Sequence, residues 1–230
     1  MEFTDYEGLI RASLGWEIAY EFSNRASHTS VRMQGTQYPN SITEPEFEII
    51  RETVSKNNLM HGYEVATGFG LSTLAMGLGF KETGGKIVTM DAYDEEVTQN
   101  PLGDNSNIKH QNTQGFKSVC QLVEKFGLED TVYPTVGWSP QDANTCINSI
   151  FDENQMLDFI FIDAFHTEDA VMNDFDSIKN RINKEKFVVM LHDADILPSS
   201  ISYIENFLKS KGSFRSERPS GFYLYSIEST

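Results

Sequence analysis

Apolar residues recur with two different periods from Thr43 onward, and these periods predict the elements of the main domain. Five short runs rich in β-branched and aromatic residues predict strands at Gly62–Thr67, Lys86–Ala92, Thr131–Val136, Asp158–Ala164 and Phe187–Leu191. Between and after them, apolar residues three and four positions apart predict helices with stripes over Leu71–Leu78, Phe116–Phe126, Val171–Ile182 and Ile201–Leu208. Such alternation of strands and helices predicts βαβ units around a parallel sheet.

The N-terminal part of the chain departs from this alternation. One helical stripe, Tyr6–Phe22, predicts an amphipathic helix, and the polar stretch Ser23–Ser41 has no clear period. We expect that stretch to be a lid or an ordered surface loop. The capping box Thr43–Glu46, with proline in the first turn, then predicts a helix start. We therefore divide the chain into an N-terminal helical cap or lid, residues 1–43, and one main domain, residues 44–230.

The C-terminal tail also breaks the pattern. Ser213–Glu217 and Phe222–Ile227 are strand-like runs, and Arg218–Gly221 between them is a turn signal. A closing β-hairpin on an otherwise parallel sheet is unusual among dinucleotide-binding Rossmann domains. The tail therefore favours a different branch of the α/β proteins.

Composition narrows the class of protein. The 230 residues are 39 % hydrophobic and 12 % aromatic, which excludes a disordered chain. The formal net charge of −16 disfavours nucleic-acid partners. No segment has the pattern of a signal peptide or a membrane span. Cys120 and Cys146 fall in segments with helical patterns and form no C-x-x-C pair, so we expect reduced thiols in a cytoplasmic protein.

Ligands of an open α/β sheet bind at the carboxyl ends of its strands, so the first strand-to-helix loop is informative. Gly68 and Gly70 allow a tight turn and a close approach to a ligand. Ser72 or Thr73 can cap the next helix. The loop is of the nucleotide-binding type, although no Gly-Lys-Ser/Thr follows as in a P-loop. By itself it could equally be an ordinary βα turn.

An acidic residue at the end of the second strand makes a nucleoside ligand more plausible. Asp91 follows Gly70 by twenty-one residues. A carboxylate at this place can accept both hydrogen bonds of a ribose diol. Further along, Trp138 could cover an adenine ring while Ser139 or Gln141 bonds its edge. Core packing is an almost equally good interpretation of Trp138.

Two later strand ends carry a cluster of acids and imidazoles. The cluster comprises Asp163, His166, His192, Asp193 and Asp195. A buried carboxylate such as Asp163 needs a partner, which could be a metal, an amine or a sulfonium. The cluster could bind a divalent cation or act as a general base. We expect Asp195, and in one interpretation His166, to be a cap or a supporting residue.

Taken in order, these segments resemble the class I S-adenosylmethionine-dependent methyltransferases, and within them the small O-methyltransferase-like branch. That branch begins its site with Glu-x-Gly-Thr-x-x-Gly-x-Ser-Thr, and this chain has Glu64–Thr73 with Ala66 at the first glycine. The Ile-Asp-x-x-His strand end is matched by Ile162–His166, and a His-Asp strand end by His192-Asp193. The resemblance covers about residues 43–227.

The resemblance implies a Rossmann-like three-layer α/β/α sandwich, with a seven-stranded, mostly parallel sheet whose last strand is antiparallel. It implies contacts of Glu64 and the first loop with the methionine part of the cofactor, of Asp91 with the ribose, and of Trp138-Ser139 with the adenine. The cofactor-binding residues expected from loop and resemblance together are Glu64, Ala66, Thr67, Gly68, Gly70, Ser72, Asp91, Ala92, Trp138, Ser139 and Asp163.

The resemblance leaves the role of a metal open. Cation-dependent catechol-type enzymes end their fifth strand in Asp-Asn, whereas this chain has His192-Asp193. We expect Asp163, His166 and His192 to be catalytic. Asp163 and Asp193 are the candidate ligands of Mg²⁺ or another divalent cation, and a metal-free route with a histidine base stays open.

The predicted function is S-adenosylmethionine-dependent O-methylation of a small molecule, without nucleic-acid or membrane partners; homo-oligomerisation is left open. One alternative is a metal-dependent hydroxylase-like enzyme on the same scaffold. Another is a non-catalytic nucleoside-binding protein. A nicotinamide dehydrogenase is the weaker option, because Thr73 stands where the third glycine of Gly-x-Gly-x-x-Gly belongs.

Overall fold

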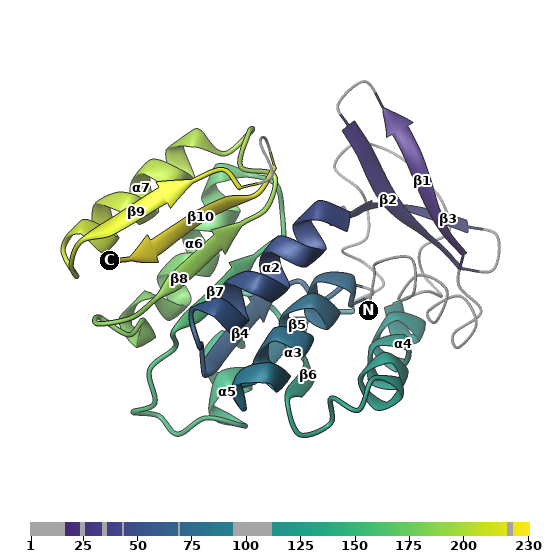
Figure 1. Cartoon of the computed structure of the whole chain (residues 1–230), viewed down its shortest axis with the longest axis horizontal. Coiled ribbons are helices and arrows are strands. Elements are labelled where there is room, and N and C mark those ends of the chain that lie inside the picture. The colour runs from purple at the N-terminus through teal and green to yellow at the C-terminus, as the bar shows by residue number, and fades with distance from the viewer. Residues whose placement is uncertain are drawn as a thin grey trace.

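The computed structural model describes residues 17–23, 26–33, 36–42, 44–68, 70–93, 112–219 and 223–230. Its strands are β1 (Glu17–Ser23), β2 (Ala26–Met33), β3 (Thr36–Ser41), β4 (His61–Val65), β5 (Lys86–Asp91), β6 (Val132–Val136), β7 (Phe159–Ile162), β8 (Val188–Leu191), β9 (Phe214–Glu217) and β10 (Tyr225–Ser229). Its helices are α2 (Glu44–Lys56), α3 (Leu71–Thr83), α4 (Asn112–Lys125), α5 (Ala143–Asn148), α6 (Glu168–Ile178) and α7 (Pro198–Lys209), with the 3₁₀ turn η2 (Lys179–Arg181). Figure 1 shows their arrangement.

The main sheet has the order β6-β5-β4-β7-β8-β10-β9. The pairs from β6 to β8 are parallel, whereas β10 pairs antiparallel with both β8 and β9. The predicted seven-stranded sheet with an antiparallel last strand is therefore confirmed, as are the five predicted parallel strands and the closing hairpin. The segment around Cys146, which has a helical pattern, forms the short helix α5.

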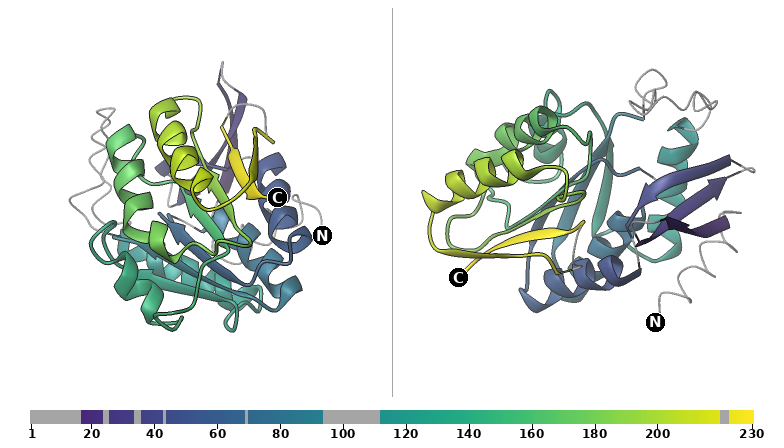
Figure 2. Two further views of the ribbon diagram at one scale, coloured as in Figure 1. Left: turned by 90° about the vertical axis from the view of Figure 1, so that its left-hand side faces the viewer. Right: turned by 90° about the horizontal axis from the view of Figure 1, so that it is seen from above.

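Two hydrophobic clusters fill the space on either side of the sheet. Successive residues of a strand point to opposite faces, and β7 shows this alternation directly. Phe159 and Phe161 belong to the cluster under α2, α3 and α4, whereas Ile160 and Ile162 belong to the cluster under α5, α6 and α7. The two views in Figure 2, one from the side and one from above, show these helix layers on opposite faces of the sheet. The predicted three-layer sandwich is thus confirmed.

The N-terminal part differs from its prediction. The helix predicted over Tyr6–Phe22 is wrong at Glu17–Phe22, where the structure has β1; the rest of the predicted helix lies outside the described residues. The stretch predicted as a lid or loop, Ser23–Ser41, contains β2 and β3, which complete an antiparallel three-stranded sheet. Ile18 and Phe22 fit a helical spacing, but with Tyr20 they also fit a strand. Pairing with β2 decides for the strand, and the domain boundary at residue 43 stays a prediction.

The register of the parallel strands aligns their carboxyl ends at one edge. Val65 of β4 pairs with Met90 of β5 and with Ile162 of β7, and Ile162 pairs with Leu191 of β8. The loops that follow these four strands therefore start side by side. None of the helices in the described part of the chain is long and apolar enough to cross a membrane.

Candidate functional site

The loop between β4 and α3 has a backbone that favours glycine at three places. Ala66, Gly68 and Gly70 have φ angles of 72°, 53° and 85°. A side chain in this left-handed region is strained, and Ala66 carries that strain where the resembling family has glycine. A Cβ atom on Gly68 would meet nothing within 4 Å, so the loop leaves open space above it. Loop and space together can accommodate a ligand close to the backbone.

Glu64 lies beneath this loop and is completely buried. Its carboxylate accepts hydrogen bonds from Ser72 Oγ (2.5 Å), Thr73 Oγ1 (2.6 Å) and Thr89 Oγ1 (2.5 Å). Burial raises the pKa of Glu64 to about 7, although the three hydroxyl groups act in the opposite direction. The carboxylate thus ties the start of α3 to β4 and β5.

These contacts correct one detail of the sequence interpretation. Ser72 and Thr73 were expected as candidates to cap the helix, but their hydroxyl groups donate to Glu64. The cap residue of α3 is Gly70, which makes no side-chain cap hydrogen bond. Whether Glu64 and Ser72 contact a cofactor stays a prediction.

Asp91 joins the first two loops at the carboxyl edge. Gly68 N–H donates to Asp91 Oδ2 and Tyr93 N–H donates to Oδ1, both over 2.9 Å. Burial raises the pKa of Asp91, whereas the backbone hydrogen bonds lower it. Because each carboxylate oxygen can accept more than one hydrogen bond, Asp91 retains capacity for a diol. The predicted ribose residue is therefore placed against the predicted nucleotide loop.

Trp138 and Ser139 follow β6 at the far end of the same edge. Trp138 is half-buried and lies outside both hydrophobic clusters of the described residues, which does not support core packing as its role. The backbone N–H of Trp138 donates to Asp142 Oδ2 (2.8 Å), and Ser139 Oγ donates to Asp174 Oδ1 (2.5 Å). Asp174 is buried on α6, and burial raises its pKa to about 6 against the Ser139 hydrogen bond.

On the other side of β4, four side chains from the ends of two strands meet. His192 Nδ1 lies 3.3 Å from Asp163 Oδ1 and 3.3 Å from Asp193 Oδ2. His166 Nε2 lies 3.1 Å from Asp193 Oδ2 and 3.6 Å from Asp163 Oδ1. The structure thus brings together four of the five residues that the sequence nominated. Asp195 is exposed and lies outside this cluster, so its expected role as a cap or supporting residue stays a prediction.

The cluster is strongly coupled in charge. Burial acts to raise the pKa of Asp163, but His192 and His166 hold it down at about 2. Burial acts to lower the pKa of His192, yet the carboxylates of Asp163, Asp193 and Glu46 raise it well above its usual value. The pKa of His166 is raised chiefly by its contact with the carboxylate of Asp163. The histidines therefore partly neutralise the carboxylates of the cluster.

Sequence reasoning missed two residues that hold His192. Glu46 on α2 is 1 % exposed, and its Oε2 lies 3.4 Å from His192 Nε2. The ring of Tyr223 stacks on the imidazole with a centroid distance of 6.3 Å. The only sequence signal for Glu46 was its position beside Phe47 on the apolar side of α2. An acidic residue is rare on a buried helix face and indicates a buried polar partner.

The donor set of this cluster fits a divalent cation. One ligand atom from each of Asp163, His192 and Asp193 can lie within 4.8 Å of the others. The Nδ1 atom of His192 is buried and makes no hydrogen bond, although it faces two carboxylates. An unsatisfied buried nitrogen beside two carboxylate oxygens is well suited to a shared positive charge. Asp163 and Asp193 are the ligands that the sequence proposed, and His192 is an additional one.

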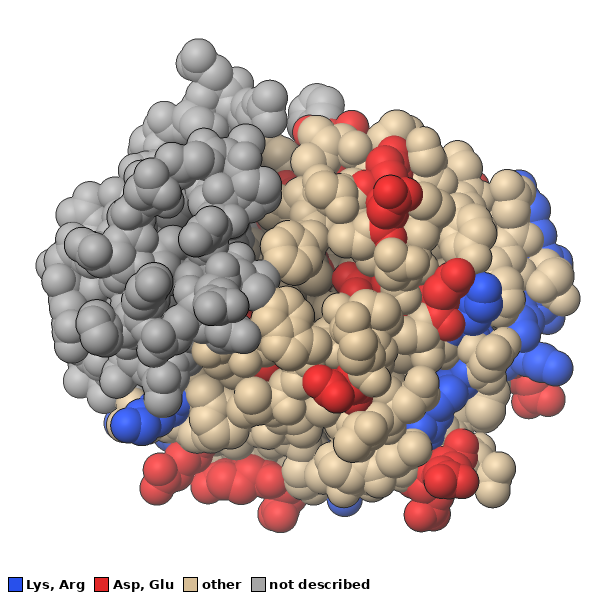
Figure 3. Space-filling model, turned by 180° about the vertical axis from the view of Figure 1, so that it is seen from behind, with Lys and Arg blue, Asp and Glu red and all other residues tan. Residues whose placement is uncertain are grey.

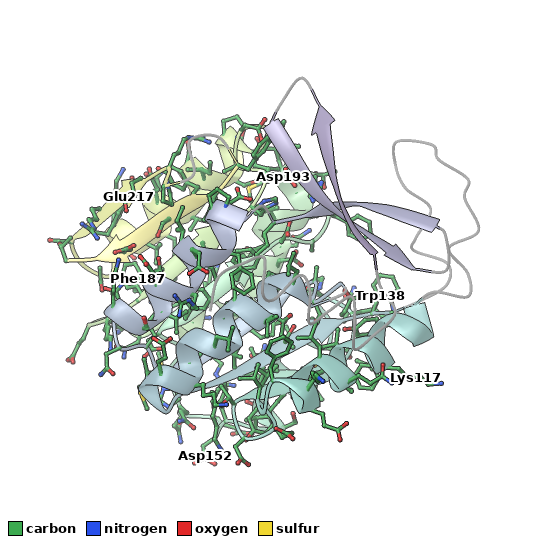
Figure 4. All side chains as sticks on the ribbon, turned by 45° about the vertical axis from the view of Figure 1, so that its right-hand side comes forward. Lys117, Trp138, Asp152, Phe187, Asp193 and Glu217 are labelled. Atoms are coloured by element: carbon green, nitrogen blue, oxygen red, sulfur yellow. The ribbon has the colours of Figure 1, made fainter. Side chains whose placement is uncertain are left out.

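The two groups of residues share one edge of the sheet. Ala66 N–H donates to Met90 O, Asp163 N–H to Val65 O and His192 N–H to Ile162 O, so the backbone links neighbouring loops. Figure 4 shows Trp138 and Asp193 on the side of the main sheet toward β1–β3, whereas Phe187 and Asp152 lie on the opposite side. The Asp91 loop and the Asp163 cluster flank β4 from its two sides. A ligand across this edge can therefore contact both.

Comparisons with known proteins agree with this geometry. A family model described as a methyltransferase domain matches residues 64–194, which is more than half of the chain. No match was found among curated protein sequences.

Solved structures share the fold at low sequence identity. An O-methyltransferase from Bacillus cereus in complex with S-adenosylhomocysteine is 17 % identical, with a TM-score of 0.57 over 82 % of this chain and 81 % of that chain. TomG, an O-methyltransferase from Streptomyces achromogenes in complex with S-adenosylmethionine, is 12 % identical, with a TM-score of 0.57 over 83 % and 81 %. The S-adenosylhomocysteine-bound methyltransferase PaMTH1 from Podospora anserina is 14 % identical, with a TM-score of 0.57 over 81 % and 79 %.

The strand order, the loop after β4 and the extent of the family match lead to the same assignment. This chain belongs to the methyltransferase-domain family.

Proposed function

We propose that the protein transfers the methyl group of S-adenosylmethionine to a hydroxyl group of a small molecule. The observation that carries this proposal is the position of Asp91 and Asp163. Asp91 accepts from the Gly68 amide in the loop after β4, and Asp163 follows β7, the other neighbour of β4 in the sheet. A nucleoside held at Asp91 can therefore extend along the edge toward Asp163.

The cofactor supplies an electrophilic methyl group on a sulfonium sulfur. The acceptor oxygen forms a bond to the methyl carbon while the sulfur–carbon bond breaks, and the acceptor proton leaves to a base. Holding both reactants in line can lower the barrier by about 7–11 kcal/mol in favourable cases. Asp91 and the loop residues Ala66, Thr67, Gly68 and Gly70 would hold the cofactor, and Trp138 would cover its adenine ring.

We assign different roles to the two histidines. The His166 side chain is 36 % exposed and adjoins Asp193, so it can reach an acceptor hydroxyl and take its proton. The His192 side chain is only 6 % exposed and is enclosed by carboxylates, so it is better placed to hold the cluster together. Asp163 lies between them and would face the acceptor and the methyl donor.

We further propose that Asp163 and Asp193 bind a divalent cation, with His192 as a third ligand. When bound, such an ion would polarise the acceptor hydroxyl and favour loss of its proton. The described residues supply three ligand atoms, and the acceptor would provide a further one.

The acceptor would have an apolar part. Phe165 and Ile196 are large apolar side chains with 43 % and 48 % exposure, in the segments next to His166 and Asp193. Such exposed apolar residues beside a polar cluster favour a ligand with an apolar body and a hydroxyl group.

We propose that the protein acts in the cytoplasm without nucleic-acid partners. The described structure has both cysteines as free thiols, Cys120 exposed and Cys146 buried. Figure 3 shows acidic side chains spread across one face of the molecule, with most Lys and Arg of that face on one side. This distribution favours an acidic, solubilising surface over a phosphate-binding one.

Calorimetric titration with S-adenosylhomocysteine tests the cofactor assignment. We expect binding in the micromolar range, and no binding at high micromolar concentration would contradict the proposal. A panel of phenols and polar alcohols, assayed by transfer of a labelled methyl group, then tests the acceptor class. Binding of the cofactor without methylation of any acceptor would favour a nucleoside-binding protein.

A further inference from the structure

The Glu46–His192 contact joins two parts of the chain that no motif connects. Glu46 lies on the first turn of α2 and His192 at the end of β8, 146 residues apart. Both are buried, at 1 % and 6 % side-chain exposure. Burying a carboxylate costs free energy unless hydrogen-bond donors or positive charge surround it. The imidazole of His192 is one such group beside Glu46.

The imidazole of His192 is held from two sides. Its Nε2 atom faces Glu46 Oε2 at 3.4 Å, and Tyr223 stacks on the ring face. A carboxylate accepts from an N–H group, so Glu46 favours the form of His192 that carries a proton on Nε2. The Nδ1 atom then points at Asp163 and Asp193, and it can bind a metal ion once its own proton is released.

The surroundings of Nδ1 favour a cation. This buried atom makes no hydrogen bond although it lies 3.3 Å from a carboxylate oxygen of Asp163 and 3.3 Å from one of Asp193. A lone pair facing two carboxylates is repelled unless a positive charge lies between them. Without a metal ion that charge is the proton of the imidazolium, which the carboxylates favour, and a bound metal ion would take the place of the Nδ1 proton. Histidine ligands of metals generally donate their other ring N–H to a carboxylate, which fixes the ring and raises its basicity. Glu46 occupies the place of that carboxylate.

We propose that Glu46 is a positioning residue that presents His192 Nδ1 as a nitrogen ligand and thereby biases the cluster toward a transition-metal ion. The proposal rests on the metal-binding part of the proposed function. Carboxylate oxygens alone suit Mg²⁺, Ca²⁺ or Mn²⁺, whereas an imidazole nitrogen suits Fe²⁺, Zn²⁺ and other first-row divalent metals. The occupant of the site is therefore a first-row divalent metal in preference to Mg²⁺.

Calorimetric titrations of the full chain with Mn²⁺ and with Mg²⁺ test the metal preference. We expect wild type to bind Mn²⁺ more tightly than Mg²⁺ by about tenfold or more, because Mn²⁺ accepts a nitrogen ligand more readily than the strongly hydrated Mg²⁺ does. His192→Asn should reduce this preference, since it removes the imidazole. Equal or tighter binding of Mg²⁺ by wild type, or no binding of either ion, overturns the proposal.

Variants of Glu46 test the positioning role. Loss of a carboxylate behind a metal-binding histidine typically costs about 10–100-fold in affinity, so Glu46→Ala should weaken Mn²⁺ binding by this factor. Glu46→Gln keeps an oxygen that can accept the Nε2–H bond and should recover part of the loss. Glu48→Ala is the matched control, because Glu48 is a partly exposed acid on the same helix that pairs with Arg51.

S-Adenosylhomocysteine titrations of the same variants separate this role from folding and from the cofactor assignment. Glu46→Ala should bind S-adenosylhomocysteine as wild type does while it loses Mn²⁺ affinity. Unchanged Mn²⁺ affinity in folded Glu46→Ala overturns the proposal. If Glu46→Ala does not fold, two other measurements replace it. The first is the Mn²⁺ affinity of Glu46→Gln, and the second is the ¹⁵N spectrum of His192 in the Zn²⁺-saturated wild type. Unchanged affinity in the variant, together with a doubly protonated His192 in that spectrum, overturns the proposal. Metal binding without S-adenosylhomocysteine binding would contradict the methyl-donor assignment alone.

Discussion

Ala66 shows how one residue can depart from a family pattern and still keep its fold. Its φ of 72° lies in the region that glycine adopts freely and other residues adopt at a cost. Alanine has the smallest side chain that is strained at positive φ, and Ala66 is only half-buried, which leaves room for its Cβ atom. The departure therefore affects stability more than it affects the path of the loop.

We expect Ala66→Gly to stabilise the protein slightly. Relief of the left-handed strain is worth about 1–2 kcal/mol, and the greater freedom of glycine in the unfolded chain takes back about 0.4–1 kcal/mol. The net gain should be up to about 1.6 kcal/mol in urea unfolding, at unchanged slope. Ala66→Val is the opposite control and should destabilise, because β-branched residues are rare at positive φ. A more stable Val variant would contradict the strain argument.

Asp91 is the residue that most directly tests the ribose assignment. Asp91→Asn removes the charge but keeps one oxygen that can accept a backbone hydrogen bond. Hydrogen bonds to a charged group contribute about 1.5–3 kcal/mol, so S-adenosylhomocysteine affinity should fall about 10–100-fold. Asp130→Asn, an exposed acid before β6, should leave the affinity unchanged. Equal affinities of both variants would remove Asp91 from the cofactor site.

Neighbouring elements meet at the site through buried polar contacts. The loop after β6 is tied to α6 by Ser139 and Asp174, whereas β4, β5 and α3 are tied by Glu64. Both acids have raised pKa values because burial disfavours their charged forms. These contacts hold the loops in place, and because the two acids have raised pKa values, they also make the free energy of unfolding depend on pH.

Asp174 should make the protein less stable as pH rises from about 4 to about 6. Its pKa in the folded protein is about 6, above the ordinary 3.8, so the folded state binds more protons in this interval. The difference corresponds to about 3 kcal/mol. Asp174→Asn, which can accept the same Ser139 hydrogen bond, should remove this slope.

Urea unfolding of wild type and Asp174→Asn at pH 4, 5, 6 and 7 measures the effect. Asp169→Asn, an exposed acid on the same helix, serves as the control and should keep the wild-type slope. Parallel pH profiles of wild type and Asp174→Asn would show that Asp174 is not the group responsible.

At the scale of the whole molecule, ligand binding should raise the free energy of unfolding and therefore Tm. A ligand present at 100 times its Kd and bound only by the folded state adds about 2.7 kcal/mol. For a chain of this size, S-adenosylhomocysteine should then raise Tm by about 5–10 °C. Mn²⁺ should raise Tm further, and a chelator should reverse that part only. An unchanged Tm with saturating S-adenosylhomocysteine would argue against a cofactor site in the main domain.

Much of the fold could be predicted from local patterns. The β-branched runs and helical stripes after Thr43 depend on burial against a single sheet, and each element is long enough to show its period. The first strand-to-helix loop and Asp91 follow from the rule that ligands bind at carboxyl ends of strands. The sequence by itself therefore determined the architecture of the main domain and the edge on which its site lies.

The N-terminal strands could not be predicted in this way. Ile18, Tyr20 and Phe22 are compatible with both periods, and β2, the strand that pairs with β1, comes from a polar segment with no pattern of its own. Strand pairing of β1 with β2 outweighed the weak helical spacing. A local pattern cannot decide such a case, because the stabilising hydrogen bonds are made to another segment.

Only the tertiary structure decided which polar residues face each other. It placed Ser72 and Thr73 on Glu64, Ser139 on Asp174, and Glu46 behind His192. Strand-end motifs nominated Asp163, His166, His192 and Asp193, but Glu46 belongs to a helix far away in sequence. The physical reason is that a motif records short-range spacing, whereas a buried charge is stabilised by whichever distant groups the packed layers bring to it.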